Sequence, residues 1–157
     1  MSSDFVIQAL PMELFSPLLC LSDEELAHHK VMWLDVDSEP GFPCRVSLTD
    51  AKMGERVLAF SFEHLDVDSP YRSSGPIFVR EHASTAEPAR NEVPGMLRRR
   101  LQSIRAYDSA HMMIGAQVSQ GDELERVIEN QFKNNALEYL HLHNANPGCF
   151  NCAVYRA

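Results

Sequence analysis

The segment RVLAFSFEHL, residues 56–65, constrains the fold more than any other stretch of this sequence. In an extended chain Leu58, Phe60 and Phe62 lie on one face, and the residues between them, which face the other way, are apolar or small. A strand with two such faces is covered on both sides, so we expect this segment in the middle of a sheet.

Further strand patterns lie on either side of this central segment. They alternate apolar with polar residues or are rich in β-branched and aromatic residues. The expected strands are FVIQAL (5–10), KVMWLDV (30–36), CRVSLTD (44–50), PIFVRE (76–81), SIRAYD (103–108), MMIGAQV (112–118), ALEYLHLHN (136–144) and CAVYRA (152–157).

Two helices are predicted by their end signals and periodicity. Ser22 and Glu25 form a capping box that starts a helix in LSDEELAHH. Residues 121–133 carry an apolar face at helical spacing. That face consists of Leu124, Val127, Ile128 and Phe132. Shorter helical turns are expected after Pro11 and Pro94, because proline suits the start of a helix.

Strands outnumber helices and often follow one another directly, which favours an α+β fold over a doubly wound one. We expect a single globular domain over residues 1–157, with a mainly antiparallel sheet and two or three helices packed on it. Residues 82–95 contain two prolines and no periodicity, and we expect them to form a long surface loop.

The composition describes an acidic globular protein. The 157 residues are 45% hydrophobic and carry a formal charge of -8, which argues against a general nucleic-acid binder. The N-terminus has Asp4 where a signal peptide would be cationic, and no stretch approaches the roughly 20 apolar residues of a membrane span. We therefore expect a cytoplasmic protein whose partners include neither nucleic acid nor a membrane, and its oligomeric state is left open.

The segment YLHLHN carries the principal candidate site. Side chains of a strand alternate between its two faces. Leu140 and Leu142 are therefore expected to point inward, and His141 and His143 to project together on the other face. Three interpretations stay open for this pair: a metal site, other polar binding or catalysis, and an exposed strand face without chemistry. A metal would need a third ligand. The candidates for that ligand are Glu63, His64 and Asp68.

The histidine pair is expected to share a pocket with an arginine, Arg105 or Arg80. A fixed cation beside imidazoles that titrate near neutral pH favours their neutral form. Neutral histidines can accept a proton or a metal, as a small hydrolytic or lyase-type site requires.

Cys149 follows the Pro147-Gly148 turn and is a candidate nucleophile, with a histidine as its base and amides of the turn as oxyanion donors. The alternative is a small buried cysteine without chemistry. Cys149 and Cys152 face opposite ways on an extended strand, so neither a structural zinc site nor a redox pair is favoured. We expect all four cysteines to be free thiols in a reduced protein.

Arginines near strand ends indicate a small anionic ligand, and Arg105 is the best candidate to grip its acidic group. Arg98, Arg99 and Arg100 point in different directions on a helical turn, and we expect them to pair with carboxylates. The predicted catalytic residues are His141, His143 and Cys149, and the predicted ligand-binding residues are Arg45, Glu63, His64, Tyr71, Arg80, Arg105 and Asn144. The sequence specifies no cofactor.

Four blocks of the sequence occur in an order that resembles a known family. They are GFPCRVSL, SPYRSSGPIFVRE, LRRRLQSIRAYD and YLHLHNANPGC. Together they resemble a bacterial family catalogued as domain of unknown function 1203, over nearly the whole chain. The family pattern carries the histidine pair and Cys149 but not Cys152, and the resemblance implies no reaction, cofactor or partner.

Two functions from different classes follow. The first is a small enzyme or small-molecule-binding domain with a polar His/Arg pocket at the ends of the sheet strands. The second is a non-catalytic interaction domain that uses its acidic face or a sheet edge, and it would show an exposed apolar patch or self-association. The first requires the histidine pair and at least one arginine in a single cleft.

Overall fold

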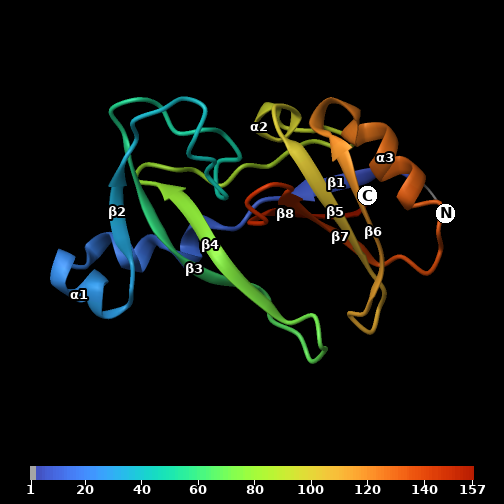
Figure 1. The fold of residues 1–157 in the computed structure, drawn as a ribbon, viewed down its shortest axis with the longest axis horizontal. Coiled ribbons are helices and arrows are strands. Elements are labelled where there is room, and N and C mark those ends of the chain that lie inside the picture. Colours follow the sequence, from blue (N-terminus) through green and yellow to red (C-terminus); the bar gives the residue numbers. More distant parts are fainter. Residues whose placement is uncertain (1–2) are drawn as a thin grey trace.

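A computed structural model describes residues 3–157 and shows two antiparallel sheets side by side (Figure 1). The larger sheet has the strand order β1-β8-β7-β5-β6 and the smaller one the order β2-β3-β4. The strands of the larger sheet are β1 Phe5–Gln8, β8 Phe150–Arg156, β7 Tyr139–Asn144, β5 Leu101–Tyr107 and β6 Met113–Gln120. Those of the smaller sheet are β2 Met32–Asp35, β3 Arg56–Leu65 and β4 Ser73–Arg80. The α+β class is confirmed, with the strands divided between two sheets of a single compact domain.

Three short α-helices and three 3₁₀ turns complete the described fold. The α-helices are α1 Asp23–His28, α2 Gly95–Arg98 and α3 Leu124–Gln131. The 3₁₀ turns are η1 Met12–Leu14, η2 Ser16–Cys20 and η3 Gly121–Glu123. The predicted capping box starts α1, where Ser22 accepts from the backbone of Glu25 and Glu25 accepts from the backbone of Ser22. None of the helices in residues 3–157 is long and apolar enough to cross a membrane.

The main core lies between α3 and one face of the larger sheet. The predicted apolar face of α3 is buried there, and Ile128 is fully enclosed. Leu140 and Leu142 of β7 point into this core, as their alternation predicts. The opposite face of β7 is therefore the one that carries the odd-numbered residues of that strand.

RVLAFSFEHL, residues 56–65, forms β3, the middle strand of the smaller sheet. β3 pairs with β2 on one side and β4 on the other. Phe60 and Phe62 pack on Phe15, with ring centroids 5.3 and 5.5 Å from it. Separate apolar clusters cover the two faces of the smaller sheet. Leu65 at the end of β3 packs with Tyr107 and Tyr139 of the larger sheet.

The predicted strand CRVSLTD is wrong. Residues 44–50 form a turn with isolated bridges only, and Leu48 has a positive φ of 52°. Val46 and Leu48 are buried, so the alternation that suggested a strand comes from a turn whose apolar side chains point inward. The turn buries the side chain of Arg45 as well.

The long segment between β4 and α2 contains neither a helix nor a strand. Its backbone is nevertheless anchored, because Ala86 N–H donates to Val46 and Asn91 N–H donates to Phe5. These two bonds tie the segment to the turn at residues 44–50 and to β1.

Candidate functional site

The histidines of β7 lie on the face of the larger sheet that points away from α3. His141 and His143 are two residues apart on the strand, and their ring centroids are 6.4 Å apart. Their exposed fractions are only 4% and 1%. The interpretation as an exposed strand face is therefore wrong, because the rings are covered by other parts of the chain.

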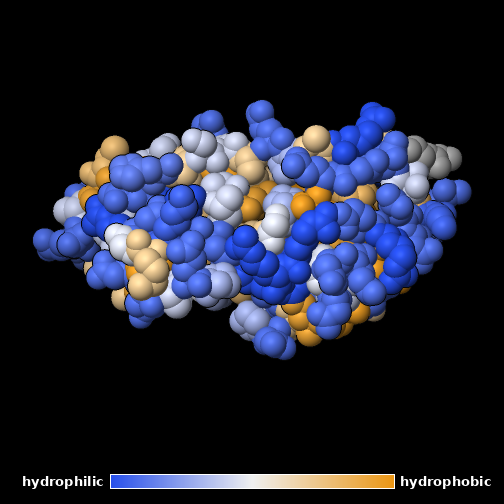
Figure 2. Space-filling model, turned by 90° about the horizontal axis from the view of Figure 1, so that it is seen from above, coloured by the Kyte–Doolittle hydropathy of each residue, from blue (hydrophilic) through white to orange (hydrophobic). Residues whose placement is uncertain are grey.

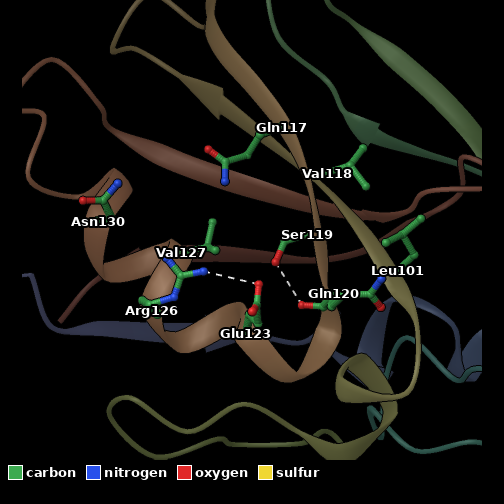
Figure 3. Close-up of a pocket in the computed structure, with 9 residues that line it drawn as sticks. All are labelled: Leu101, Gln117, Val118, Ser119, Gln120, Glu123, Arg126, Val127 and Asn130. Atoms are coloured by element: carbon green, nitrogen blue, oxygen red, sulfur yellow. Dashed lines mark hydrogen bonds and ion pairs between the residues drawn. The ribbon is translucent and has the colours of Figure 1, made fainter.

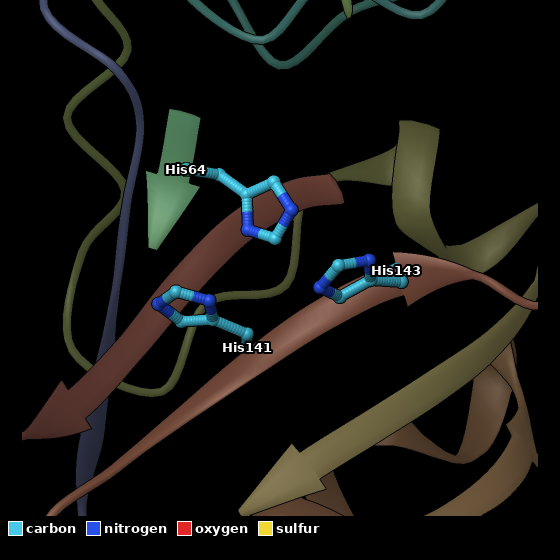
Figure 4. A group of neighbouring side chains, drawn as sticks. All are labelled: His64, His141 and His143. Atoms are coloured by element: carbon cyan, nitrogen blue, oxygen red, sulfur yellow. The ribbon is translucent and has the colours of Figure 1, made fainter. Parts of the chain in front are cut away.

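His64 supplies the cover from the smaller sheet. It lies near the end of β3, and its ring centroid is 4.9 Å from that of His143 and 6.0 Å from that of His141. The ring also stacks on Phe150 at 5.0 Å with an interplanar angle of 8°. One nitrogen from each histidine lies within 4.8 Å of the others (Figure 4). We call His64, His141 and His143 the histidine cluster.

Two strand irregularities place these side chains. The β3–β4 register shifts between Phe62 and Leu65, where His64 lies. The β7–β8 register shifts between Leu142 and His143. A bulge bends a strand and redirects its side chains, and such irregularities are frequent beside functional sites. His64 and His143 thus both lie at departures from regular strand pairing, whereas His141 is regularly paired.

The cluster has free nitrogens in a buried setting. His143 Nδ1 lies 2.9 Å from the carbonyl oxygen of Gly148, an acceptor, so Nδ1 carries the proton and donates. The Nε2 atom of His143 then carries a free lone pair, and it is buried with no hydrogen-bond partner. The Nδ1 atoms of His64 and His141 are also buried without a partner.

The rings are neutral over a wide pH range. Burial, followed by the positive charge of Arg105, lowers the pKa of His64 to about 4. Burial, followed by the two neighbouring histidines, lowers the pKa of His141 to about 3, and burial likewise lowers the pKa of His143 to about 3. The neutral form is favoured, as expected, but the first cause is desolvation of the charged rings, and the charge of Arg105 adds to it.

Arg105 belongs to the same face of the sheet. It lies directly opposite His141 in the β5–β7 pairing, so both side chains project to one side. Its Nε donates to Ser103 Oγ at 3.3 Å. Within residues 3–157 no carboxylate forms an ion pair with it, so its charge is available to a ligand. The stacked rings of Tyr107 and Tyr139 continue the face beyond His141.

Three of the predicted ligand-binding residues lie elsewhere. Arg80 makes a two-pronged ion pair with Glu55. Glu63 pairs with Arg72 on the surface at 3.3 Å. Tyr71 touches only the edge of this region, with its ring 6.2 Å from that of Tyr107. The structure therefore does not bring these side chains into the histidine cluster. Asp68, the remaining candidate ligand, lines a separate surface hollow.

The other predicted residues form a second group at a cavity of about 600 Å³. Arg45, Asn144 and Cys149 line it, and Asn144 Nδ2 lies 3.5 Å from Cys149 Sγ. Cys152 instead points into the main core, where burial raises its pKa. All four cysteines are free.

A smaller hollow of about 330 Å³ lies between β6 and α3 (Figure 3). Its charged side chains, Glu123 and Arg126, pair with each other at 3.3 Å. No unbalanced charge remains there to attract a ligand.

Sequence reasoning named every member of the histidine cluster but did not single out His64. His64 was one of three candidates for a third ligand, and nothing local distinguishes it from Glu63 beside it. It also missed Phe150, whose ring lies against all three histidines, and the Gly148 carbonyl. The Pro147-Gly148 turn is the feature of the sequence that could have indicated this contact. A tight turn after a strand can bring its backbone carbonyl groups within hydrogen-bonding distance of side chains on that strand.

The comparisons with known proteins give a single result. A family model described as a protein of unknown function (DUF1203) matches residues 41–156. No curated protein and no solved structure matches the chain. The match includes the three histidines, Arg45, Arg105 and Cys149.

Proposed function

The chain belongs to the family of proteins of unknown function DUF1203, and from that starting point we propose that it is a metal-binding protein whose histidine cluster holds a divalent transition metal, zinc foremost. The metal site is of the open kind, with one coordination position left for water or an anionic ligand. The proposal goes beyond the family match and rests on the geometry of the cluster.

The carrying observation is the convergence of three unpartnered histidine nitrogens in a buried place. A buried polar atom without a partner costs free energy of roughly 1–3 kcal/mol. Three such atoms that face a common point are therefore unusual unless something binds there. Neutral imidazole is a good ligand for zinc, copper, iron and nickel. The low pKa values of the cluster keep the lone pairs available without competition from protons.

The spacing is wider than in a metal-bound site. In a tetrahedral zinc site with zinc–nitrogen distances of about 2.0–2.1 Å, the ligating nitrogens lie about 3.3–3.4 Å apart. The nitrogens of the cluster lie within 4.8 Å of one another, so we expect metal binding to rotate the three rings toward a common point. The hydrogen bond from His143 Nδ1 to Gly148 fixes the tautomer and orientation of that ring, as outer partners of metal ligands do.

The coordination number indicates the chemistry. Three protein ligands and an open position are typical of catalytic zinc, which lowers the pKa of bound water and polarises carbonyl groups. Arg105 adds a positive charge beside His141, and this charge favours an anion in the open position. We therefore propose hydrolytic or lyase-type chemistry on a small anionic substrate.

Metal analysis of the purified protein tests the proposal. We expect about one equivalent of zinc or another transition metal per chain, and cobalt(II) added to the metal-free protein should give the absorption of a tetrahedral site. His64→Ala and His143→Ala should each abolish stoichiometric binding. His82→Ala is the matched control, because His82 is exposed and outside the cluster. Unchanged metal content in both cluster variants would refute the proposal.

A second candidate function, an interaction domain, draws support from β6. This strand is an edge of the larger sheet, and Ile114 and Val118 are 41% and 60% exposed on it. Edge strands with exposed apolar residues favour pairing with another strand. Concentration-dependent self-association that Val118→Lys abolishes would support this function.

A further inference from the structure

We propose that the cavity lined by Arg45, Arg99 and Arg100 is a second ligand site, which binds a small organic anion: a carboxylate or phosphate group carried on an apolar body. The site is separate from the histidine cluster and does not depend on a metal.

The charge of the cavity lining is one-sided. Among residues 3–157, three arginines line the cavity and no aspartate or glutamate does. The chain as a whole has a formal charge of -8, so this concentration of positive charge is a local exception. Arg99 and Arg100 share a single carboxylate, that of the buried Asp50. Asp50 therefore balances only one of the three positive charges.

Arg45 is the most unusual member of this group. It is 1% exposed, and its guanidinium donates to the carbonyl oxygens of Phe150 and Pro43. Within residues 3–157 no carboxylate forms an ion pair with it. A buried charge without a counter-charge is strongly unfavourable. Burial lowers the pKa of Arg45, and the neighbouring Cys149 and Cys44 oppose this shift without cancelling it. An anion in the cavity would supply the missing negative charge.

The rest of the lining indicates what the anion carries. Pro43, Phe78, Leu101 and Pro147 form apolar walls, and the cavity volume of about 600 Å³ is in the range of small-molecule sites. Figure 2 shows that hydrophilic residues cover most of the face seen from above, and that hydrophobic and weakly polar residues show between them near the middle and along the lower edge. A small organic anion whose apolar part lies between these walls and whose charged group points to the arginines would match both the apolar lining and the positive charge of the cavity. A fully hydrated inorganic ion would leave the apolar walls without a partner.

Cys149 provides a reporter for occupancy. It is half-buried at the cavity, whereas Cys20 is exposed on η2 and does not line it. The rate of alkylation of each cysteine can be followed by mass spectrometry in the same sample. An occupied cavity should protect Cys149 and leave Cys20 unchanged.

The experiment compares anionic with neutral probes at millimolar concentration. We expect benzoate and phenyl phosphate to slow alkylation of Cys149 severalfold, and the neutral benzamide to have no effect. Inorganic phosphate alone should protect less than phenyl phosphate, because it lacks the apolar body. Equal protection by benzamide, or no protection by either organic anion, would overturn the proposal.

Variants separate the charge from the shape of the site. Arg99→Gln should weaken benzoate binding about two- to fivefold, as expected for a partly exposed charge. The matched control is Arg98→Gln at the end of α2, next to Arg99, since Arg98 pairs with Glu125 and does not line the cavity. Ala145→Phe should fill the cavity and abolish protection without changing any charge. These variants avoid Arg45, whose loss endangers folding. Wild-type affinity in both Arg99→Gln and Ala145→Phe would place the anion elsewhere.

Discussion

His64 and His143 come from different sheets, yet their ring centroids lie 4.9 Å apart and nearly perpendicular, at 79°. In the described part of the chain neither ring pairs with a carboxylate, and each has a buried nitrogen without a hydrogen bond. The contact joins the end of β3 to the middle of the larger sheet. The proposed metal site is thus also a link between the two sheets, so we expect metal binding to stabilise the whole fold.

As the pH is lowered, the metal-free protein should begin to lose stability at a higher pH than protonation of its carboxylates would cause. The folded-state pKa values of the histidine cluster, about 3 to 4, lie below the ordinary value of about 6.5. Between these values the unfolded chain binds more protons than the folded one, so stability is full above about pH 6.5 and is lost as the pH falls. Each histidine that stays neutral contributes a slope of about 1.4 kcal/mol per pH unit.

Urea unfolding at several pH values measures this slope. His141→Phe should give a shallower dependence between about pH 6.5 and pH 4.5. The pKa values of Glu55 and Glu81 are lowered in the folded protein, so these groups affect stability only below the usual pH range of glutamate titration. They therefore do not mask the contribution of the histidines. Stability that is flat down to about pH 5 would contradict the buried, neutral state of the cluster.

Arg105 should control which ligand occupies the open metal position. Replacing it with Met removes the cation opposite His141, so an anion bound to the metal loses a partner. Loss of a hydrogen bond to a charged group costs about 1.5–3 kcal/mol, which corresponds to roughly a tenfold or greater loss of anion affinity. Acetate titration of the cobalt-substituted protein, followed by absorption, gives the affinity.

The conservative variant Arg105→Lys should retain part of the acetate affinity. Metal content should be unchanged in both Arg105 variants, since the arginine is not a ligand. Equal acetate affinity in wild type and Arg105→Met would show that the arginine plays no part in ligand binding.

Replacement of Ile128 with Ala should destabilise the protein by roughly 2–4 kcal/mol. Ile128 is fully buried in the core between α3 and the larger sheet. Denaturant unfolding measures the loss. Glu129→Ala is the control, because this neighbouring residue is only partly buried and outside the core. A loss below about half a kcal/mol would mean that α3 does not pack as described.

The cysteines should react in two classes. Cys20 is exposed and Cys149 half-buried, whereas Cys44 and Cys152 are buried. A thiol reagent should therefore titrate two thiols in the native protein and all four after denaturation under non-oxidising conditions. A total of two in the denatured protein would indicate a disulfide and refute the prediction of free thiols.

Local patterns in the sequence determined most of the elements. The capping box at Ser22, the apolar face of α3 and the alternation in YLHLHN depend on residues a few positions apart, and each predicted its element correctly. The same reasoning failed for residues 44–50, because alternate burial in a turn resembles alternate burial in a strand. Periodicity records which side chains face inward and carries no information about the backbone path that turns them there.

Only the tertiary structure decided how the site residues divide. The sequence predicted a single pocket for histidines and arginines, whereas the structure separates the histidine cluster with Arg105 from the cavity with Arg45, Asn144 and Cys149. The structure also places His64, and not the adjacent Glu63, beside the histidines of β7, at the register shift near the end of β3. The low pKa values of the histidines follow from packing between two sheets. Contacts between residues distant in the chain depend on the meeting of complete elements, so no spacing along a strand specifies them.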